Sequence, residues 1–256
     1  MKRQRSIIDK LLPAGVFALI ILLWQMLSVT EVVPAFMLPS PVKVVKAFIG
    51  DFGMLMGHAG YTLAESAIGM AVSIVIGFFA AVVMDRFTFV KKAFYPLLVV
   101  TQTVPAIAIA PLLVLWFGFG LSPKIILIVI VCFFPIAVGF LDGFASADPD
   151  EIKLLRSMGA KGMQIFRHIK LPRSLPHFFA GLKVSSSYCI VSAVISEWLG
   201  GTNGLGVYMT RVRKSYAFDK MFAVIILVSV LSLLLMALIS LLEKKLMPYK
   251  GEQITK

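Results

Sequence analysis

Six long apolar stretches, separated by polar connections, constrain this chain more than any other feature of its sequence. A helix needs about 20 mostly apolar residues to cross the hydrocarbon core of a bilayer. The chain is 59% hydrophobic and 15% charged, whereas soluble domains have about 45–50% apolar and about 25% charged residues. We therefore predict an all-α, polytopic membrane protein with six transmembrane helices. The stretches are residues 13–29, 62–84, 94–117, 122–144, 178–195 and 222–242.

The first apolar stretch follows a basic N-terminus, as the core of a secretory signal peptide does. It is longer than the about 7–15 apolar residues of such a core, and no small-residue cleavage site follows it. We therefore expect a retained first transmembrane helix. The predicted organisation is a cytoplasmic segment over residues 1–12, a six-helix domain over 13–246, which includes cytoplasmic helices at 148–172, and a cytoplasmic tail over 247–256.

The distribution of lysine and arginine predicts the orientation. One alternating set of connections contains 17 of these residues, and the other set contains 7. Cytoplasmic connections carry the excess of positive charge in membrane proteins, so both termini are expected in the cytoplasm of a bacterial inner membrane. The basic segment 210–220 then lies outside, against this trend. The richer set is the N-terminus, 85–93, 145–177 and the C-terminus; the poorer set is 30–61, 118–124 and 197–221.

The net charge of +12 does not indicate nucleic-acid binding, because the cations are spread between apolar runs rather than gathered in one patch. Cys132 and Cys189 lie inside apolar stretches and are expected to be buried thiols, not a disulfide or a metal site. The chain has no phosphate-binding loop, so we expect it to bind no ATP and to need no cofactor or metal of its own. The paired catalytic residues of an enzyme are not recognisable either.

The longest cytoplasmic connection contains signals for two short amphipathic helices. Asp148 is a good N-cap, Pro149 suits the first helical position, and Glu151 has the spacing of a capping box. Gly159 can end this helix in the left-handed conformation. The second helix is predicted over residues 162–169, closed by the Leu-Pro that follows. The apolar stripes are Ile152, Leu155 and Met158 in the first helix and Met163, Phe166 and Ile169 in the second.

Two interpretations of this connection remain open on physical grounds. The helices can lie on lipid headgroups, or they can form a shape that enters a cytoplasmic partner. Two further features interrupt the apolar stretches. The third stretch contains Pro96, Pro105 and Pro111, which predict a kinked helix that faces other helices. The glycine-rich segment 196–208 predicts a tight, re-entrant turn on the outer side.

The cytoplasmic connection resembles the motif of permease subunits of binding-protein-dependent ABC importers, which reads Glu-Ala-Ala, three residues, Gly, nine residues, Ile-x-Leu-Pro. Here Gly159 is followed by nine residues and then by Ile169-Lys170-Leu171-Pro172. The first half departs from the motif, because residues 153–155 are Lys-Leu-Leu. Residues 36–48, 105–120 and 196–209 are also similar to the nitrate, sulfonate and taurine branch, and the last of them to members assigned to pyrimidine precursors of thiamine.

The resemblance implies a type I importer fold and a division of labour. Two permease copies, here a homodimer, would form the pore in the membrane. A separate ATP-binding subunit would use the ATP, and an extracytoplasmic binding protein would deliver a small organic solute or nitrate. The residues that would contact the ATPase are Lys153, Leu155, Gly159, Ala160, Phe166, Ile169, Leu171 and Pro172.

Polar residues inside apolar stretches are costly and usually face the bundle interior. Candidates for the translocation pathway are Gln102, Thr103, Ser186, Tyr188 and Glu197. Serines also serve in ordinary helix packing, Glu197 could instead bind a backbone donor of the glycine-rich turn, and Glu65 could simply reach water. Gly69 and Gly77 are expected to allow close helix contact. The alternative function is an ion-coupled secondary transporter that works alone, although no inverted repeat is visible.

Overall fold

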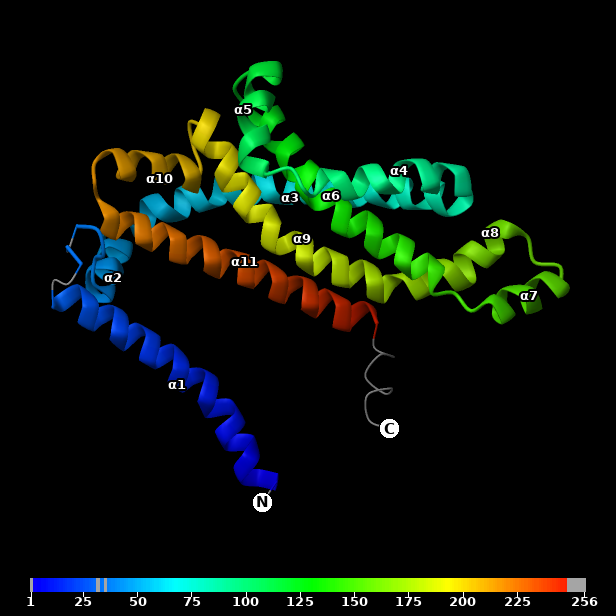
Figure 1. The fold of residues 1–256 in the computed structure, drawn as a ribbon, viewed down its shortest axis with the longest axis horizontal. Helices are drawn as coiled ribbons and strands as arrows, with labels where there is room; N and C mark the ends of the chain where they lie inside the picture. Colours follow the sequence, from blue (N-terminus) through cyan, green and yellow to red (C-terminus); the bar gives the residue numbers. More distant parts are fainter. Residues whose placement is uncertain (1, 31–32, 35, 248–256) are drawn as a thin grey trace. The chain divides into compact units, whose positions relative to one another are not determined.

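The computed structural model describes residues 2–30, 33–34 and 36–247, and in this part of the chain all regular structure is helical (Figure 1). Five helices are long and apolar enough to cross a membrane, and the bent pair α4 and α5 makes a sixth if it counts as one span. The predicted all-α fold is confirmed. The helices are α1 (Lys2–Val29), α2 (Pro41–Gly50), α3 (Phe52–Arg86), α4 (Thr88–Thr101), α5 (Ala106–Phe117), α6 (Leu121–Ala145), α7 (Pro149–Ser157), α8 (Gly162–Ile165), the π-helical turn η1 (Phe166–Lys170), α9 (Leu171–Gly200), α10 (Leu205–Lys214) and α11 (Phe218–Leu246).

The chain forms two compact units, of which the first comprises Met1–His58 and Tyr208–Leu227. Within it, the indole nitrogen of Trp24 in α1 donates to the carbonyl of Pro39 at 3.0 Å, just before α2 begins. Asp51, between α2 and α3, accepts from the ammonium of Lys220 at 2.7 Å and from the hydroxyl of Tyr208. These contacts join segments that are far apart in the sequence.

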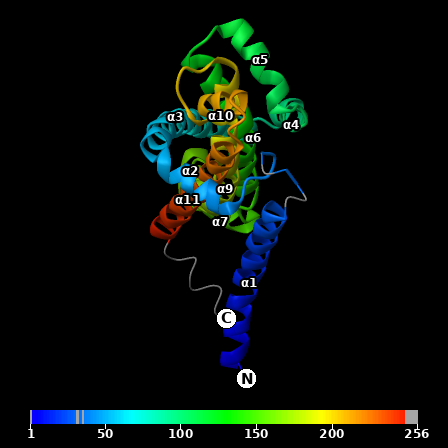
Figure 2. The same cartoon turned by 90° about the vertical axis from the view of Figure 1, so that its left-hand side faces the viewer.

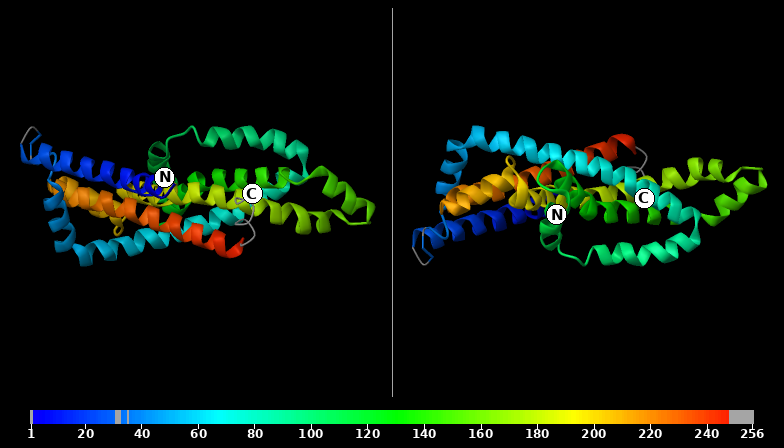
Figure 3. Two further views of the ribbon diagram at one scale, coloured as in Figure 1. Left: turned by 90° about the horizontal axis from the view of Figure 1, so that it is seen from below. Right: turned by 90° about the horizontal axis from the view of Figure 1, so that it is seen from above.

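The second unit comprises Ala59–Val207 and Val228–Lys256, and its centre is the pair α6 and α9, which run side by side (Figures 1 and 3). Glycines allow this approach. A Cβ on Gly139 would lie 2.7 Å from the carbonyl oxygen of His177, and a Cβ on Gly143 would lie 2.6 Å from the Cβ of Ser174. Both distances are too short for a larger residue, so the two backbones are in direct contact.

Helix α3 packs on α6 in the same way. A Cβ on Gly69 would lie 2.7 Å from the Cβ of Ile128, and a Cβ on Gly77 would lie 2.9 Å from Cγ2 of Ile136. The expectation that these two glycines allow close helix contact is confirmed. Around them, apolar side chains of α3, α6 and α9 form the main buried cluster of the unit.

The third apolar stretch is broken rather than only kinked. Between its two halves, α4 and α5, the chain bends by 101° across residues 102–105 (Figure 2). Pro105 precedes α5 and lacks the N–H that would continue the helix, whereas Pro96 and Pro111 lie inside the two helices. The prediction that this segment faces other helices holds for α5, which lies against α6 and α9 and buries Ala110 and Leu113 there. Helix α4, in contrast, buries no side chain.

The predicted end of the second cytoplasmic helix is also corrected. Instead of stopping at Leu171-Pro172, α8 continues through η1 into α9 as one helix over Gly162–Gly200. Pro172 has no N–H to offer the carbonyl four residues earlier. The helix takes up this defect by a π-helical turn, in which the N–H of Leu171 donates to the carbonyl of Phe166.

Candidate functional site

The segment α7–α8 and the turn between them form the first candidate site, at the end of the second unit where α6 ends and α9 begins (Figure 3). Helix α7 begins as predicted: Asp148 caps it by accepting from the N–H of Asp150 at 2.9 Å, and Pro149 is the first helical residue. Gly159 has φ +86°, the left-handed conformation that was expected to end the helix. Glu151 forms an ion pair with Arg173 rather than a contact with the cap.

The base of this segment is fixed by a small apolar cluster. Ala147, Ile165 and Ile169 are buried there, and Ile152, Leu155 and Ala160 pack against them. The ring of Phe166 lies 5.3 Å from the ring of Phe144 in α6, centroid to centroid. Four of the six residues of the two predicted apolar stripes therefore face the chain itself, and η1 is the part of the second helix that lies against α6.

Two ion pairs add to this anchoring. The ammonium of Lys170 lies 2.7 Å from a carboxylate oxygen of Asp85, at the end of α3, and both side chains are largely shielded from solvent. Arg173 at the start of α9 pairs with Glu151 in α7. Both pairs connect elements that are separate in sequence, so α7, α8 and α9 are held in a fixed relation.

The tip of the segment carries exposed apolar side chains. Met158 and Met163 each expose 75% of their surface, and Leu154 exposes 62%. These are not the residues that the motif singles out. Of the predicted ATPase contacts, Lys153, Gly159 and Pro172 are exposed, Leu155, Ala160, Phe166 and Leu171 are half-buried, and Ile169 is buried. Ile169 is therefore not available to a partner in this conformation, and the exposed methionines flank the glycine turn.

The predicted pathway residues divide into two groups. Gln102 and Thr103 are exposed in the bend between α4 and α5, and Tyr188 is exposed on α9. Ser186 is buried and donates to the carbonyl of Lys183 at 2.7 Å, an ordinary bond within a helix. Glu197 is only 1% exposed. The structure therefore does not bring the five predicted pathway residues together in one site.

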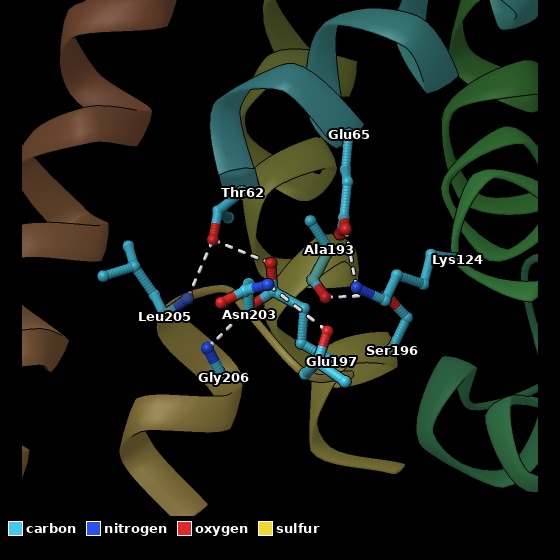
Figure 4. Close-up of polar contacts among 10 residues, drawn as sticks. Thr62, Glu65, Lys124, Ala193, Ser196, Glu197, Asn203, Leu205 and Gly206 are labelled. Carbon is cyan, nitrogen blue, oxygen red and sulfur yellow. Dashed lines mark hydrogen bonds and ion pairs between the residues drawn. The ribbon is translucent and has the colours of Figure 1, made fainter. Parts of the chain in front are cut away.

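Glu197 belongs instead to a buried polar cluster at the other end of the second unit (Figure 4). One carboxylate oxygen accepts from the hydroxyl of Thr62 at 2.7 Å, and the other accepts from the N–H of Gly206 at 2.6 Å. The hydroxyl oxygen of Thr62 in turn accepts from the N–H of Leu205 at 2.9 Å. Glu197 and Thr62 together therefore satisfy the first two backbone donors of α10, which no residue within that helix could reach.

An ion pair in this cluster was missed by the sequence analysis. The ammonium of Lys124 lies 2.6 Å from Oε1 of Glu65, and the two side chains are 8% and 9% exposed. The alternative that Glu65 simply reaches water is therefore wrong, because its side chain is buried and paired. The available signal was the occurrence of opposite charges in two apolar stretches, since a charge inside a membrane helix usually has a partner. Their 59-residue separation gave no local clue to the pairing.

The thiols of Cys132 and Cys189 are buried and free, which confirms the expectation for both. Cys132 donates to the carbonyl of Ser185 at 3.5 Å, and Cys189 donates to the carbonyl of Ser66 at 3.2 Å. In the part of the chain that the structure describes, His, Cys, Asp and Glu form no group of three or more that could hold a metal ion.

Comparison with known proteins decides what this architecture is. Residues 73–248 match the family model of the binding-protein-dependent transport system inner membrane component. The chain belongs to this family of permeases. The formylaminopyrimidine transport permease protein ThiX of Halalkalibacterium halodurans is 35% identical over 99% of this chain and all of its own length. The putative aliphatic sulfonates transport permease protein SsuC of Bacillus subtilis is 30% identical over 91% of this chain and 86% of its own. The taurine transport system permease protein TauC of Escherichia coli is 26% identical over 94% and 90%.

Solved structures agree on the fold. An inward-facing structure of the MetNI methionine ABC transporter has a chain with TM-score 0.67 at 19% identity, over 76% of this chain and 96% of that one. A chain of an amino acid ABC transporter structure has TM-score 0.62 at 17% identity, over 77% and 96%. The protein is therefore an inner-membrane permease subunit of a binding-protein-dependent ABC importer, with the type I fold.

Proposed function

We propose that this permease forms the path for a small organic solute and is driven through α7–α8 by a separate ATP-binding subunit in the cytoplasm. One observation carries the coupling proposal. Met158 and Met163 are 75% exposed at the tip of a segment whose base is buried against α6 and tied to α3. Exposed apolar groups on a rigid support are typical of a protein–protein contact.

The contact residues follow from exposure. Leu154, Met158 and Met163 would enter the ATPase, with Lys153, Gly159 and Pro172 beside them. The other predicted contacts pack on the inner side of the segment and would keep it in shape without touching the ATPase. They are Leu155, Ala160, Phe166, Ile169 and Leu171. Lys153 already pairs with Asp150 at 2.9 Å on the exposed face of α7, and this pair would meet the partner in place of the acidic residue of the motif.

The other partners follow from the family. A second copy of this chain would complete the pore and cover part of the apolar surface of α4 and α5, an extracytoplasmic binding protein would deliver the solute, and both termini would lie in the cytoplasm. The chain itself would need no cofactor, because ATP is used by the partner. Gln102, Thr103 and Tyr188 are the pathway candidates with exposed side chains, and Ser186 and Glu197 would line the path only after a rearrangement.

The substrate class is proposed from the relatives. The formylaminopyrimidine permease ThiX matches over 99% of this chain at 35% identity, more than the sulfonate or taurine permeases. An aminopyrimidine-like solute is therefore the first candidate, and a sulfonate or taurine is the second.

Co-purification tests the coupling. The tagged chain is extracted gently from its own membranes, and its partners are identified by mass spectrometry beside the variants Met158→Asp and Met163→Asp. Met37→Asp is the matched control, because Met37 is also exposed but lies in the connection predicted on the outer side. We expect an ATPase with the wild type and the control, and its loss from both tip variants. No ATPase with the wild type would contradict the importer mechanism and favour the stand-alone secondary transporter.

A further inference from the structure

A pocket lies in the second unit where α6 begins and α9 ends, at the opposite ends of these helices from α7 and α8. Its volume is about 370 Å³, within the range of about 300–1,000 Å³ that is usual for small-molecule sites. Segments from α3, the α5–α6 junction and the α9–α10 turn contribute to its lining. Six of the lining residues are Tyr61, Glu65, Phe119, Lys124, Gly201 and Asn203.

The wall of this pocket contains a carboxylate oxygen without a partner. Oε1 of Glu65 receives the ammonium of Lys124, but Oε2 is buried and accepts no hydrogen bond. A buried acceptor left unpaired costs about 1–3 kcal/mol, and more when it is charged. Such groups are few in native proteins and usually have a functional reason. A donor from outside the chain would remove this cost.

The oxygen is screened from solvent in this conformation, so a donor must reach it by a small rotation of the carboxylate or a shift of the lining turn. The turn is suited to such a shift. It contains Gly200 and Gly201, which line the pocket, and Gly204, with φ +118°. Glycine permits backbone changes that other residues resist.

The free oxygen of Glu65 selects the kind of ligand. The charged residues that line the pocket are Glu65 and Lys124, which compensate each other. Glu197 lies in the same buried cluster, but both of its carboxyl oxygens already accept hydrogen bonds, from Thr62 and Gly206 (Figure 4). The oxygen of Glu65 without a partner can therefore be satisfied only by a donor from outside the chain. The oxygens of an anion have no proton to donate to it and are repelled, whereas a neutral or cationic group with N–H donors is attracted.

We propose that this pocket is a binding subsite for a neutral or cationic solute that donates N–H hydrogen bonds, with the free oxygen of Glu65 as acceptor. Tyr61 and Phe119, which are 54% and 79% exposed, offer aromatic surface for a planar ring. An aminopyrimidine meets these requirements, and an alkyl sulfonate does not. The inference rests on the proposed function, and it chooses between the substrate classes that the relatives leave open.

Direct binding to the permease tests the subsite without a binding protein. The full-length chain in lipid nanodiscs, with the subunits that co-purify with it, is titrated calorimetrically with 4-aminopyrimidine and with pentanesulfonate. We expect saturable binding of 4-aminopyrimidine only. The variant Glu65→Gln should weaken it at least tenfold, because the amide pairs its oxygen with Lys124 and turns a donor towards the ligand. Equal or tighter binding of pentanesulfonate, no binding of either probe, or unchanged binding by the variant would overturn the proposal.

Two further variants guard against trivial effects. Glu243→Gln is the matched control, because Glu243 also pairs with a lysine, Lys183, but does not line the pocket; it should bind like the wild type. Phe119→Ala removes aromatic surface from the pocket without touching the ion pair; because Phe119 is 79% exposed, it should weaken binding while leaving the melting temperature unchanged. The two proposals can fail separately. A complex that contains the ATPase but does not bind 4-aminopyrimidine would contradict only the subsite. A chain that binds 4-aminopyrimidine but never retains an ATPase would contradict only the coupling proposal.

Discussion

The carboxylate of Glu197 at the end of α9 accepts a hydrogen bond at 2.7 Å from Thr62, a residue 135 positions earlier in α3. The same carboxylate accepts the N–H of Gly206 at the start of α10. One side chain thus joins three helices within the second unit. Each oxygen of this buried carboxyl group accepts a hydrogen bond, so its burial leaves neither oxygen unpaired.

We expect Glu197→Ala to lower the free energy of unfolding by about 2–3 kcal/mol, because it leaves the hydroxyl of Thr62 and the buried N–H of Gly206 without their acceptor. Glu197→Gln should cost less, since its amide oxygen still accepts one of these bonds. A thiol-reactive dye can follow unfolding, because both cysteines are buried and free. Combining Thr62→Val with Glu197→Ala should give less than the sum of the two losses; strict additivity would mean that the bond contributes nothing.

The contact between α6 and α9 leads to a prediction about Gly143. Replacing it by alanine places a Cβ 2.6 Å from that of Ser174, and relieving such an overlap costs about 1–3 kcal/mol. The yield of folded protein after detergent extraction, measured by size-exclusion chromatography, should fall. Gly60→Ala is the control, since nothing lies within 4 Å of its added carbon. Equal yields from both variants would show that the two helices can separate at no cost.

The glycine turn between α7 and α8 leads to another prediction. Gly159 has φ +86°, and an L-residue in the left-handed region costs about 1–2 kcal/mol. Gly159→Ala should therefore loosen the tip and increase hydrogen exchange of residues 157–162. Gly162→Ala, in a helix and with open space around its added carbon, should leave exchange unchanged. The prediction is contradicted if the two variants exchange alike.

The first unit has a pH-dependent contact. The hydrogen bond from Lys220, followed by that from Tyr208, holds the pKa of Asp51 below its ordinary value. A carboxyl with a lowered pKa in the folded state contributes stability above its unfolded pKa of about 3.9, and this contribution is lost as the pH falls through the folded pKa.

Asp51→Asn should therefore reduce stability at pH 7 by about 0.2–1 kcal/mol, as for other partly exposed pairs, and should flatten the loss of stability in acid. The measurement is the melting temperature of both proteins from pH 7 to pH 3. Their curves should converge at the acid end. Parallel curves over the whole range would show that Asp51 does not titrate differently in the folded and unfolded states.

The start and end of α7 could be predicted because their causes are local. An N-cap aspartate, a proline at the first position and a glycine two residues beyond the last helical residue act within one or two turns. Which side of α7 would be buried could not be predicted equally well. Met158 was expected beside Ile152 and Leu155 but is 75% exposed, because the surface that covers the stripe comes from residues in α8 and η1.

In the candidate sites, too, features with local causes could be predicted, and features that depend on contacts between distant helices could not. The prolines predicted an interruption where Gln102 and Thr103 lie, although as a kink and not as the break that leaves both side chains exposed. The pairing of Glu65 with Lys124 depends on how α3 meets α6, and this is set by Gly69 and Ile128 rather than by either charge. The passage of α8 into α9 was missed because Pro172 usually ends or kinks a helix, whereas here one π-helical turn absorbs the defect.

That continuous helix has a mechanical consequence. Over its 39 residues, Gly162–Gly200, it measures about 58 Å at 1.5 Å per residue. Its contact with α6 lies between its two ends and can serve as a fulcrum. A torque applied beside Met163 would swing the opposite end, where Glu197 holds the start of α10 and the pocket lies. A few ångströms of displacement at one tip would then become a comparable displacement at the other, with no hinge or relay of side chains between them.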